Sequence, residues 1–128
     1  MSASRISSLC DVGRSTHDPA SFHFALKDFL DGFYVAPAAA MLRQEPPFLR
    51  DVLSDAGVAD AYLAAVCDAL CRRHRFAPPS WIDSAERIPE RPWFAAQTHG
   101  LRMILLEESP PAFRERNLFV SANALSRA

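Results

Sequence analysis

The sequence has little glycine, a single lysine and no long apolar run. Four of its 128 residues are glycine, and Lys27 is the one side-chain cation that is not an arginine or a histidine. A content of 49% hydrophobic and 23% charged residues indicates a folded globular chain rather than a disordered or repetitive one. No segment approaches the roughly 20 apolar residues of a membrane span. The first residues also lack the apolar core of a signal peptide. We therefore expect a cytoplasmic protein with no membrane partner.

The cysteines are few and odd in number. Three are present, and Cys67 and Cys71 are one helical turn apart, where a relaxed disulfide does not form. Reduced, intracellular thiols are the simplest interpretation. Together with His74 these two cysteines could converge on zinc, but they also continue an apolar helical stripe, and a fourth ligand has no obvious source. We favour packing and expect no metal and no cofactor.

The sequence also lacks a recognisable catalytic motif. Its four histidines and Cys10 occur outside the patterns of nucleophile turns, glycine-rich loops and metalloproteases. We therefore expect a protein that is not an enzyme. A small enzyme built around Cys71 and His74 is the weaker hypothesis, and activity retained after both are changed to alanine would dismiss that site.

Helical periodicity dominates the first part of the chain. Residues 1–17 are rich in serine and poor in bulky apolar residues, which predicts a flexible tail. Asp18-Pro19 then offers a capping side chain and a residue suited to the first helical position. Apolar residues follow at spacings of three and four to about Tyr34, and a longer helix is predicted over 58–74, with two short helices between.

The second part of the chain is irregular, and it holds both tryptophans. The chain is polar and irregular from Ser80 to Glu90, Leu101–Leu106 is predicted to form a short helix, and Leu118–Val120 is predicted to be extended. Residues 18–128 are thus predicted to form one compact, all-α (mainly helical) domain whose C-terminal half is irregular and rich in proline and tryptophan.

Two groups of residues are candidates for contact with a partner. The apolar face of the first long helix must be covered, either by the rest of the core or by another protein. In the C-terminal half, arginine alternates with large aromatics, as it does at the centres of protein interfaces. The same mixture can grip a nucleic acid, although the glutamates nearby would repel phosphate. The candidates are Phe22, Phe29, Phe33, Trp93, Phe113, Arg114 and Arg116.

Charge is unevenly distributed along the chain. The net charge is −1, but five basic and nine acidic residues precede Arg72, whereas nine basic and six acidic residues follow from that position. A basic C-terminal half could attract DNA. Complementary faces of one folded unit explain the same distribution more simply.

The runs Pro92-Trp93-Phe94, Leu101-Arg102 and, above all, ESPPAFRERNLFV over 108–120 resemble a poorly characterised bacterial group. Some members carry this region after a helix-turn-helix DNA-binding domain. Others are short stand-alone proteins that are similar to partners of nucleotidyltransferase-like toxins. The similarity covers the chain from about Phe48 onward. It implies an antitoxin-like or regulatory role without catalysis, and it assigns no functional residues.

These observations predict a non-catalytic protein-interaction module that neutralises a toxin enzyme by direct binding. The resemblance implies that the partner is a nucleotidyltransferase-like toxin, and we expect no nucleic-acid partner. The alternative is a DNA-associated transcriptional regulator that uses the basic C-terminal half. Since no helix-turn-helix pattern precedes the shared region in this sequence, the alternative is the weaker of the two. The sequence does not predict an oligomeric state.

Overall fold

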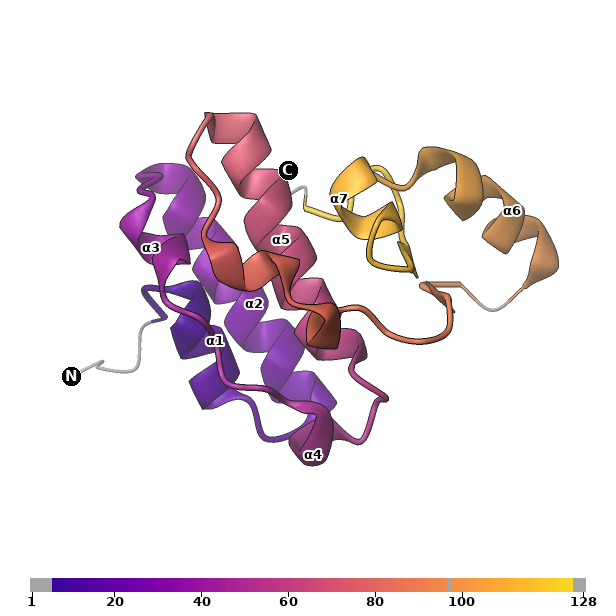
Figure 1. Ribbon diagram of the computed structural model, residues 1–128, viewed down its shortest axis with the longest axis horizontal. Helices are drawn as coiled ribbons and strands as arrows, with labels where there is room; N and C mark the ends of the chain where they lie inside the picture. The colour runs from indigo at the N-terminus through magenta and orange to yellow at the C-terminus, as the bar shows by residue number, and fades with distance from the viewer. Residues whose placement is uncertain (1–5, 97, 126–128) are drawn as a thin grey trace.

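The computed structural model describes residues 6–96 and 98–125, and these residues form a mainly helical fold, as predicted (Figure 1). In chain order the elements are α1 (Leu9–Ser15), α2 (Pro19–Val35), α3 (Ala40–Arg43), α4 (Arg50–Leu53), α5 (Val58–His74), the 3-10 helices η1 (Ser80–Asp83) and η2 (Ala85–Arg87), β1 (Trp93–Phe94), α6 (His99–Glu108), α7 (Pro111–Arg114) and β2 (Leu118–Phe119). Within the described ranges, none of the helices is both long and apolar enough to cross a bilayer.

The two long helices, α2 and α5, form the centre of the molecule. The start of α2 is fixed by a capping box, in which the carboxylate of Asp18 accepts a hydrogen bond from the backbone N–H of Ser21 at 2.7 Å. Helix α5 is buried on nearly all sides and is contacted by α4, α7, η1 and η2. Its five alanines let these neighbours approach closely. Both helices were predicted from periodicity, and both are confirmed.

The N-terminal segment differs from the predicted tail. Residues 1–5 lie outside the described residues, but α1 occupies Leu9–Ser15 and packs against α2. Ser8 caps this helix by accepting a hydrogen bond from the N–H of Asp11 at 3.1 Å, and Leu9 and Val12 are fully buried. The prediction was wrong here because a few apolar residues, three apart, are enough to anchor a short helix once a second helix covers them.

The C-terminal part is held together by a small parallel sheet. Strand β1 pairs with β2 so that Trp93 lies beside Leu118 and Phe94 beside Phe119. Because alternate residues face opposite sides of a sheet, Leu118 enters the core while Phe94 and Phe119 stack with ring centroids 4.9 Å apart. Helix α6 rests on β2 and projects from the molecule at the right of Figure 1. The predicted helix near 101–106 and the extended segment near 118–120 are both confirmed.

Candidate interaction surface

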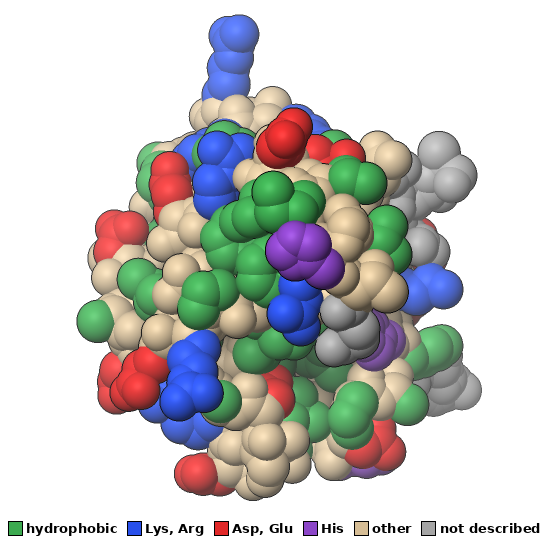
Figure 2. Space-filling view, turned by 90° about the vertical axis from the view of Figure 1, so that its right-hand side faces the viewer, with side chains coloured by type: hydrophobic (Ala, Val, Ile, Leu, Met, Phe, Trp, Pro, Cys, Tyr) green, Lys and Arg blue, Asp and Glu red, His purple; other side chains and the backbone are tan. Residues whose placement is uncertain are grey.

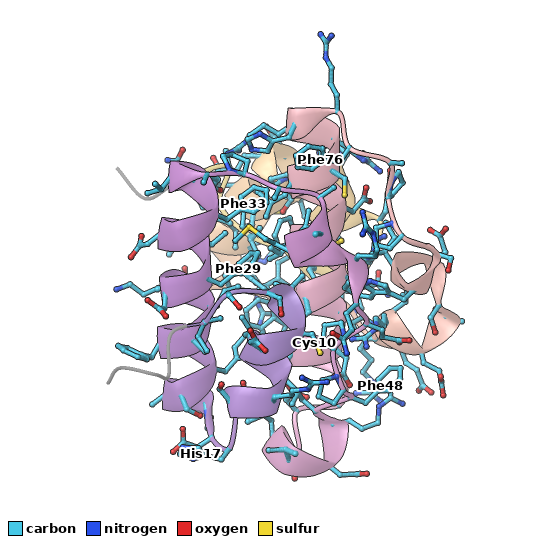
Figure 3. The ribbon with its side chains drawn as sticks, turned by 90° about the vertical axis from the view of Figure 1, so that its left-hand side faces the viewer. Cys10, His17, Phe29, Phe33, Phe48 and Phe76 are labelled. Atoms are coloured by element: carbon cyan, nitrogen blue, oxygen red, sulfur yellow. The ribbon has the colours of Figure 1, made fainter. Side chains whose placement is uncertain are left out.

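Five of the seven residues predicted to contact a partner lie in the interior. Figure 3 shows Phe29 and Phe33 extending from α2 into the space between the helices. Both are fully buried, and they stack on each other with ring centroids 5.7 Å apart. The other members of this group, Phe22, Phe113 and Arg116, are also buried, with at most 7% of the residue exposed. These five side chains therefore pack the core, and Trp93 and Arg114 are the two candidates that remain accessible.

Arg116 belongs to an internal ion-pair network. Its Nη1 atom lies 2.9 Å from Oδ2 of Asp68, and its guanidinium also donates hydrogen bonds to the backbone carbonyls of Ala112 and Ile82. Arg72 binds both oxygens of the same carboxylate, at 3.0 and 3.1 Å, and extends to Glu115 at 2.9 Å. The network joins α5 to the end of α7. Its arginines act as structural ties rather than as a basic patch.

Arg87, which the sequence did not single out, is completely buried. Its guanidinium donates to the backbone carbonyls of Pro46 and Asp60 at 2.6 and 3.2 Å, and it pairs with Glu45 at 3.1 Å. The rings of Phe48 and Trp81 lie within 4.3 and 4.9 Å of it. Three of the nine arginines from position 72 onward, Arg72, Arg87 and Arg116, are thus paired with carboxylates of the same chain, which leaves less positive charge for a phosphate backbone.

The cysteines and His74 also lie among packed side chains. All three cysteines are free and buried, and the Sγ atom of Cys67 lies 3.7 Å from the carbonyl oxygen of Leu42. Burial raises the pKa of the Cys67 thiol and keeps it protonated. The ring of His74 stacks on Phe76, with centroids 5.8 Å apart. Among the described residues, no three His, Cys, Asp or Glu side chains are grouped so that they could hold a metal ion.

A groove of about 730 Å³ opens between α2, α5 and β1, and we call it the apolar groove. Its lining residues are predominantly apolar and come from segments far apart in the sequence: Pro19, Phe22, His23, Leu26, Leu53, Asp55, Val58, Ala59, Tyr62, Trp93, Ala95, Val120, Ser121 and Ala124. The volume is in the range of sites that bind a small molecule or the side chains of a peptide, about 300–1,000 Å³.

The geometry of the apolar groove depends on an aromatic wall. The ring of Tyr62 meets Phe22 and Phe113 edge to face, with centroids 6.3 and 5.1 Å apart. Desolvation raises the pKa of Tyr62, so its hydroxyl stays neutral. Asp55, the acidic residue of the lining, accepts hydrogen bonds from two backbone N–H groups at the start of α5, at 3.0 and 2.8 Å. A ligand in the groove would therefore be recognised mainly by its shape and its apolar surface.

A second hollow, of about 820 Å³, adjoins the first along Trp93 and is more polar. It is lined by charges of both signs, and Arg50 on its wall already contacts buried Asp60 at 3.4 Å. Its charged lining residues are four carboxylates, Asp51, Asp55, Glu86 and Glu90, and two arginines, Arg50 and Arg91, so this hollow is net acidic and suits an apolar segment less well. The apolar groove is the better candidate for a binding site.

Helix α6 presents a second apolar surface. Leu101, Met103, Ile104 and Leu106 are each between 41% and 53% exposed, whereas Leu105 is buried. Figure 2 faces the side from which α6 projects and shows hydrophobic side chains gathered there, with histidine and basic side chains beside them. The base of the helix is held by Arg102, whose guanidinium lies 5.2 Å from the ring of Phe94 and donates to the carbonyl of Ala96.

The fold and these surfaces define a mainly helical domain with an apolar binding groove and a projecting apolar helix. Comparison of the chain with family models, curated proteins and solved structures finds no match. The resemblance of residues 108–120 to antitoxin-like proteins therefore stays a prediction.

Proposed function

We propose that this protein is a non-catalytic interaction module that holds an apolar segment of another protein in the apolar groove. The observation that carries the proposal is the groove itself, which is open to solvent, lined mainly by apolar side chains and bordered by the half-buried Trp93. Tryptophan and tyrosine dominate the energetics of protein interfaces because they bring a large apolar area with little rotamer freedom to lose.

The finer proposal is that the bound protein is a toxin enzyme of the nucleotidyltransferase-like class, which the module neutralises by covering its active cleft. Its support is the resemblance of residues 108–120, together with the position of that segment beside the apolar groove. Phe113 packs on Tyr62, Val120 lines the groove, and the carbonyl of Asn117 accepts a hydrogen bond from the N–H of Trp93 at 2.8 Å. The segment that carries the resemblance thus contributes one lining residue and supports Tyr62 and Trp93 from behind.

Burial of apolar side chains would supply the affinity. Each leucine or phenylalanine of the partner that becomes fully buried contributes about 1.5–3 kcal/mol before the entropic cost of association. Three such anchors supply about 5–9 kcal/mol. Because association itself costs about 4–15 kcal/mol, a tight complex also needs contacts around the rim of the groove. The DNA-regulator alternative has less support, because Arg72, Arg87 and Arg116 are already paired with carboxylates of the same chain.

Blocking the apolar groove tests the proposal. Ala95 is exposed at the groove, so Ala95→Arg places a long charged side chain there with little effect on the core. Ala77→Arg makes the same change at an exposed site outside the groove. Both variants are co-expressed with the product of the neighbouring gene in the native host, and growth and co-purification are measured.

We expect Ala95→Arg to lose capture and protection and Ala77→Arg to keep both. Equal protection by the two variants would contradict the role of the apolar groove. Failure of the unaltered protein to retain the neighbouring product would count against the toxin partner. DNA binding in a gel shift that weakens steeply with added salt would favour the regulator instead.

A further inference from the structure

Helix α6 is apolar on more sides than the protein itself covers. It has ten residues, and four of its five large aliphatic side chains (Leu101, Met103, Ile104 and Leu106) are about half exposed. A surface helix normally confines its apolar residues to the stripe that faces the core, and a helix that is apolar all round is normally buried. The exposed part of α6 is therefore a surface to be covered.

The helix has little intrinsic stability. Ten residues are below the length at which an isolated helix is stable in water, about 12–15 residues. Its described N-cap residue, Thr98, makes no capping side-chain hydrogen bond, and Gly100 lies in the first turn. Of the ten residues of α6, all of which the structure describes, one, Leu105, is buried. A contact outside the chain would supply the packing that the helix lacks.

The charges of α6 oppose its own dipole. His99 and Arg102 lie in its first turn, at the positive end, while Glu107 and Glu108 lie in its last turn, at the negative end. Either placement is unfavourable for an isolated helix. A second helix of the same sequence, packed antiparallel, makes these charges favourable, because the basic side chains and positive dipole end of each helix then lie beside the acidic side chains and negative dipole end of the other.

We propose that α6 pairs with α6 of a second copy of this chain in an antiparallel, two-fold symmetric contact centred on Met103. His99 and Glu107 lie four residues before and after Met103, so all three share one helix face. Of the exposed aliphatic residues this face includes Met103 and Leu106, whereas Leu101 and Ile104 lie on other sides of the helix. Two-fold symmetry around Met103 sets each His99 opposite the partner's Glu107. A neutral imidazole can donate a hydrogen bond to that carboxylate, and a protonated one adds charge.

The choice of a second copy follows from this self-complementarity. A parallel pair would set like ends and like charges side by side, whereas the antiparallel pair satisfies both ends of both helices with one sequence. The contact is small, because a ten-residue helix is about 15 Å long. We therefore expect a weak dimer of the kind that buries less than about 1,200 Å². This inference is independent of the proposed function, which concerns the apolar groove.

Charge exchange tests the pairing directly. His99→Glu sets two carboxylates opposite each other in the homodimer, and Glu107→Arg replaces the carboxylate that His99 contacts with a guanidinium. Each change alone should therefore weaken self-association, by about tenfold. Mixed in equal amounts, the two variants should associate with each other, because the new carboxylate at position 99 of one chain then faces the new guanidinium at position 107 of the other. Both changes favour the helix dipole, so loss of association cannot be assigned to loss of the helix.

The measurement is the mass by sedimentation or light scattering over a concentration series up to about 1 mM. We expect the unaltered chain to rise from 14.2 kDa toward twice that value. Met103→Lys should hold it at the monomer mass, whereas Phe24→Lys, which removes a 73% exposed aromatic from α2, should leave the dimer unchanged. A monomer at every concentration, an unchanged mass for Met103→Lys, or no association of the mixed variants would each overturn the proposal.

Discussion

Arg116 and Asp68 form a buried ion pair in which Nη1 and Oδ2 are 2.9 Å apart, although the two residues are 48 positions apart in the chain. The pair joins the segment after α7 to the middle of α5, and Arg72 binds the same carboxylate from the solvent side. A buried charge is tolerated only when its partner is present. The C-terminal part of the molecule, including the strand that carries Trp93, is therefore fixed to the helical core by this contact.

Replacing Arg116 with alanine should lower the free energy of unfolding by about 1.5–3 kcal/mol, because Asp68 keeps its contact with Arg72 but loses its buried hydrogen-bonded partner. Arg114→Ala is the matched control. Arg114 is exposed and donates one hydrogen bond to the carbonyl of Ser109, so its loss should cost at most about 1.5 kcal/mol. Urea denaturation of both variants makes the comparison, and equal losses would show that the ion pair is not a structural tie.

A second expected outcome concerns α1. Leu9 is fully buried, so Leu9→Ala should lower the free energy of unfolding by about 2–5 kcal/mol. Arg14→Ala, on the exposed side of the same helix, should change it by less than about 0.5 kcal/mol. If residues 6–15 were a flexible tail, the leucine variant would unfold at the same denaturant concentration as the unaltered protein.

The elements that the sequence predicted are those with a strong local signal. The faces of α2 and α5 repeat every three to four residues, and Asp18 caps its helix through a neighbour three residues away, so both features are visible in a short window. Helix α1 was missed because its composition is that of a tail. Its apolar residues are sparse, and what orders them is α2, which no local pattern describes.

The candidate surface depended on contacts between distant segments and was therefore largely missed. The sequence does not distinguish a buried arginine from an exposed one. Arg116 is buried because it pairs with an aspartate on another helix. The apolar groove is built from α2, α5 and the small sheet, so its lining could not be assembled from one stretch. Trp93 and the apolar run of α6 are the two surface features that the sequence could indicate. In both, large apolar residues stand among prolines or charged residues, where an accessible position is expected.

Stability should fall in alkaline solution. Burial raises the pKa of Cys67, whereas in the unfolded chain this thiol titrates near its usual value of about 8.5. Below that pH the thiol is protonated in both the folded and the unfolded state, and its contribution to the free energy of unfolding is at its maximum. Above it only the unfolded chain releases the proton, so the free energy of unfolding decreases by up to about 1.4 kcal/mol per pH unit.

Denaturation curves between pH 7 and pH 10 measure this decrease. Cys67→Ala should lower the stability at neutral pH, because it leaves a small cavity. It should also make the alkaline slope less steep, while Cys71, whose pKa is raised by burial as well, keeps part of that slope. An equally steep slope in that variant would assign the pH dependence to other groups. Tyr62, whose pKa is raised by desolvation, contributes in the same direction at higher pH.

The fluorescence of Trp93 should report what enters the apolar groove. The protein has two tryptophans, and Trp81 is buried with its indole Nε1 donating to the carbonyl of Leu42 at 3.3 Å, whereas Trp93 is half-buried at the groove. Trp81→Phe therefore leaves Trp93 as the one tryptophan, in contact with solvent, and acrylamide should quench its fluorescence readily.

An apolar ligand in the groove should shift the emission of Trp93 to the blue and protect it from the quencher. Adding Ala95→Arg should remove both effects. A blue shift that persists in the double variant would place the ligand outside the groove, and α6 would be the next surface to alter.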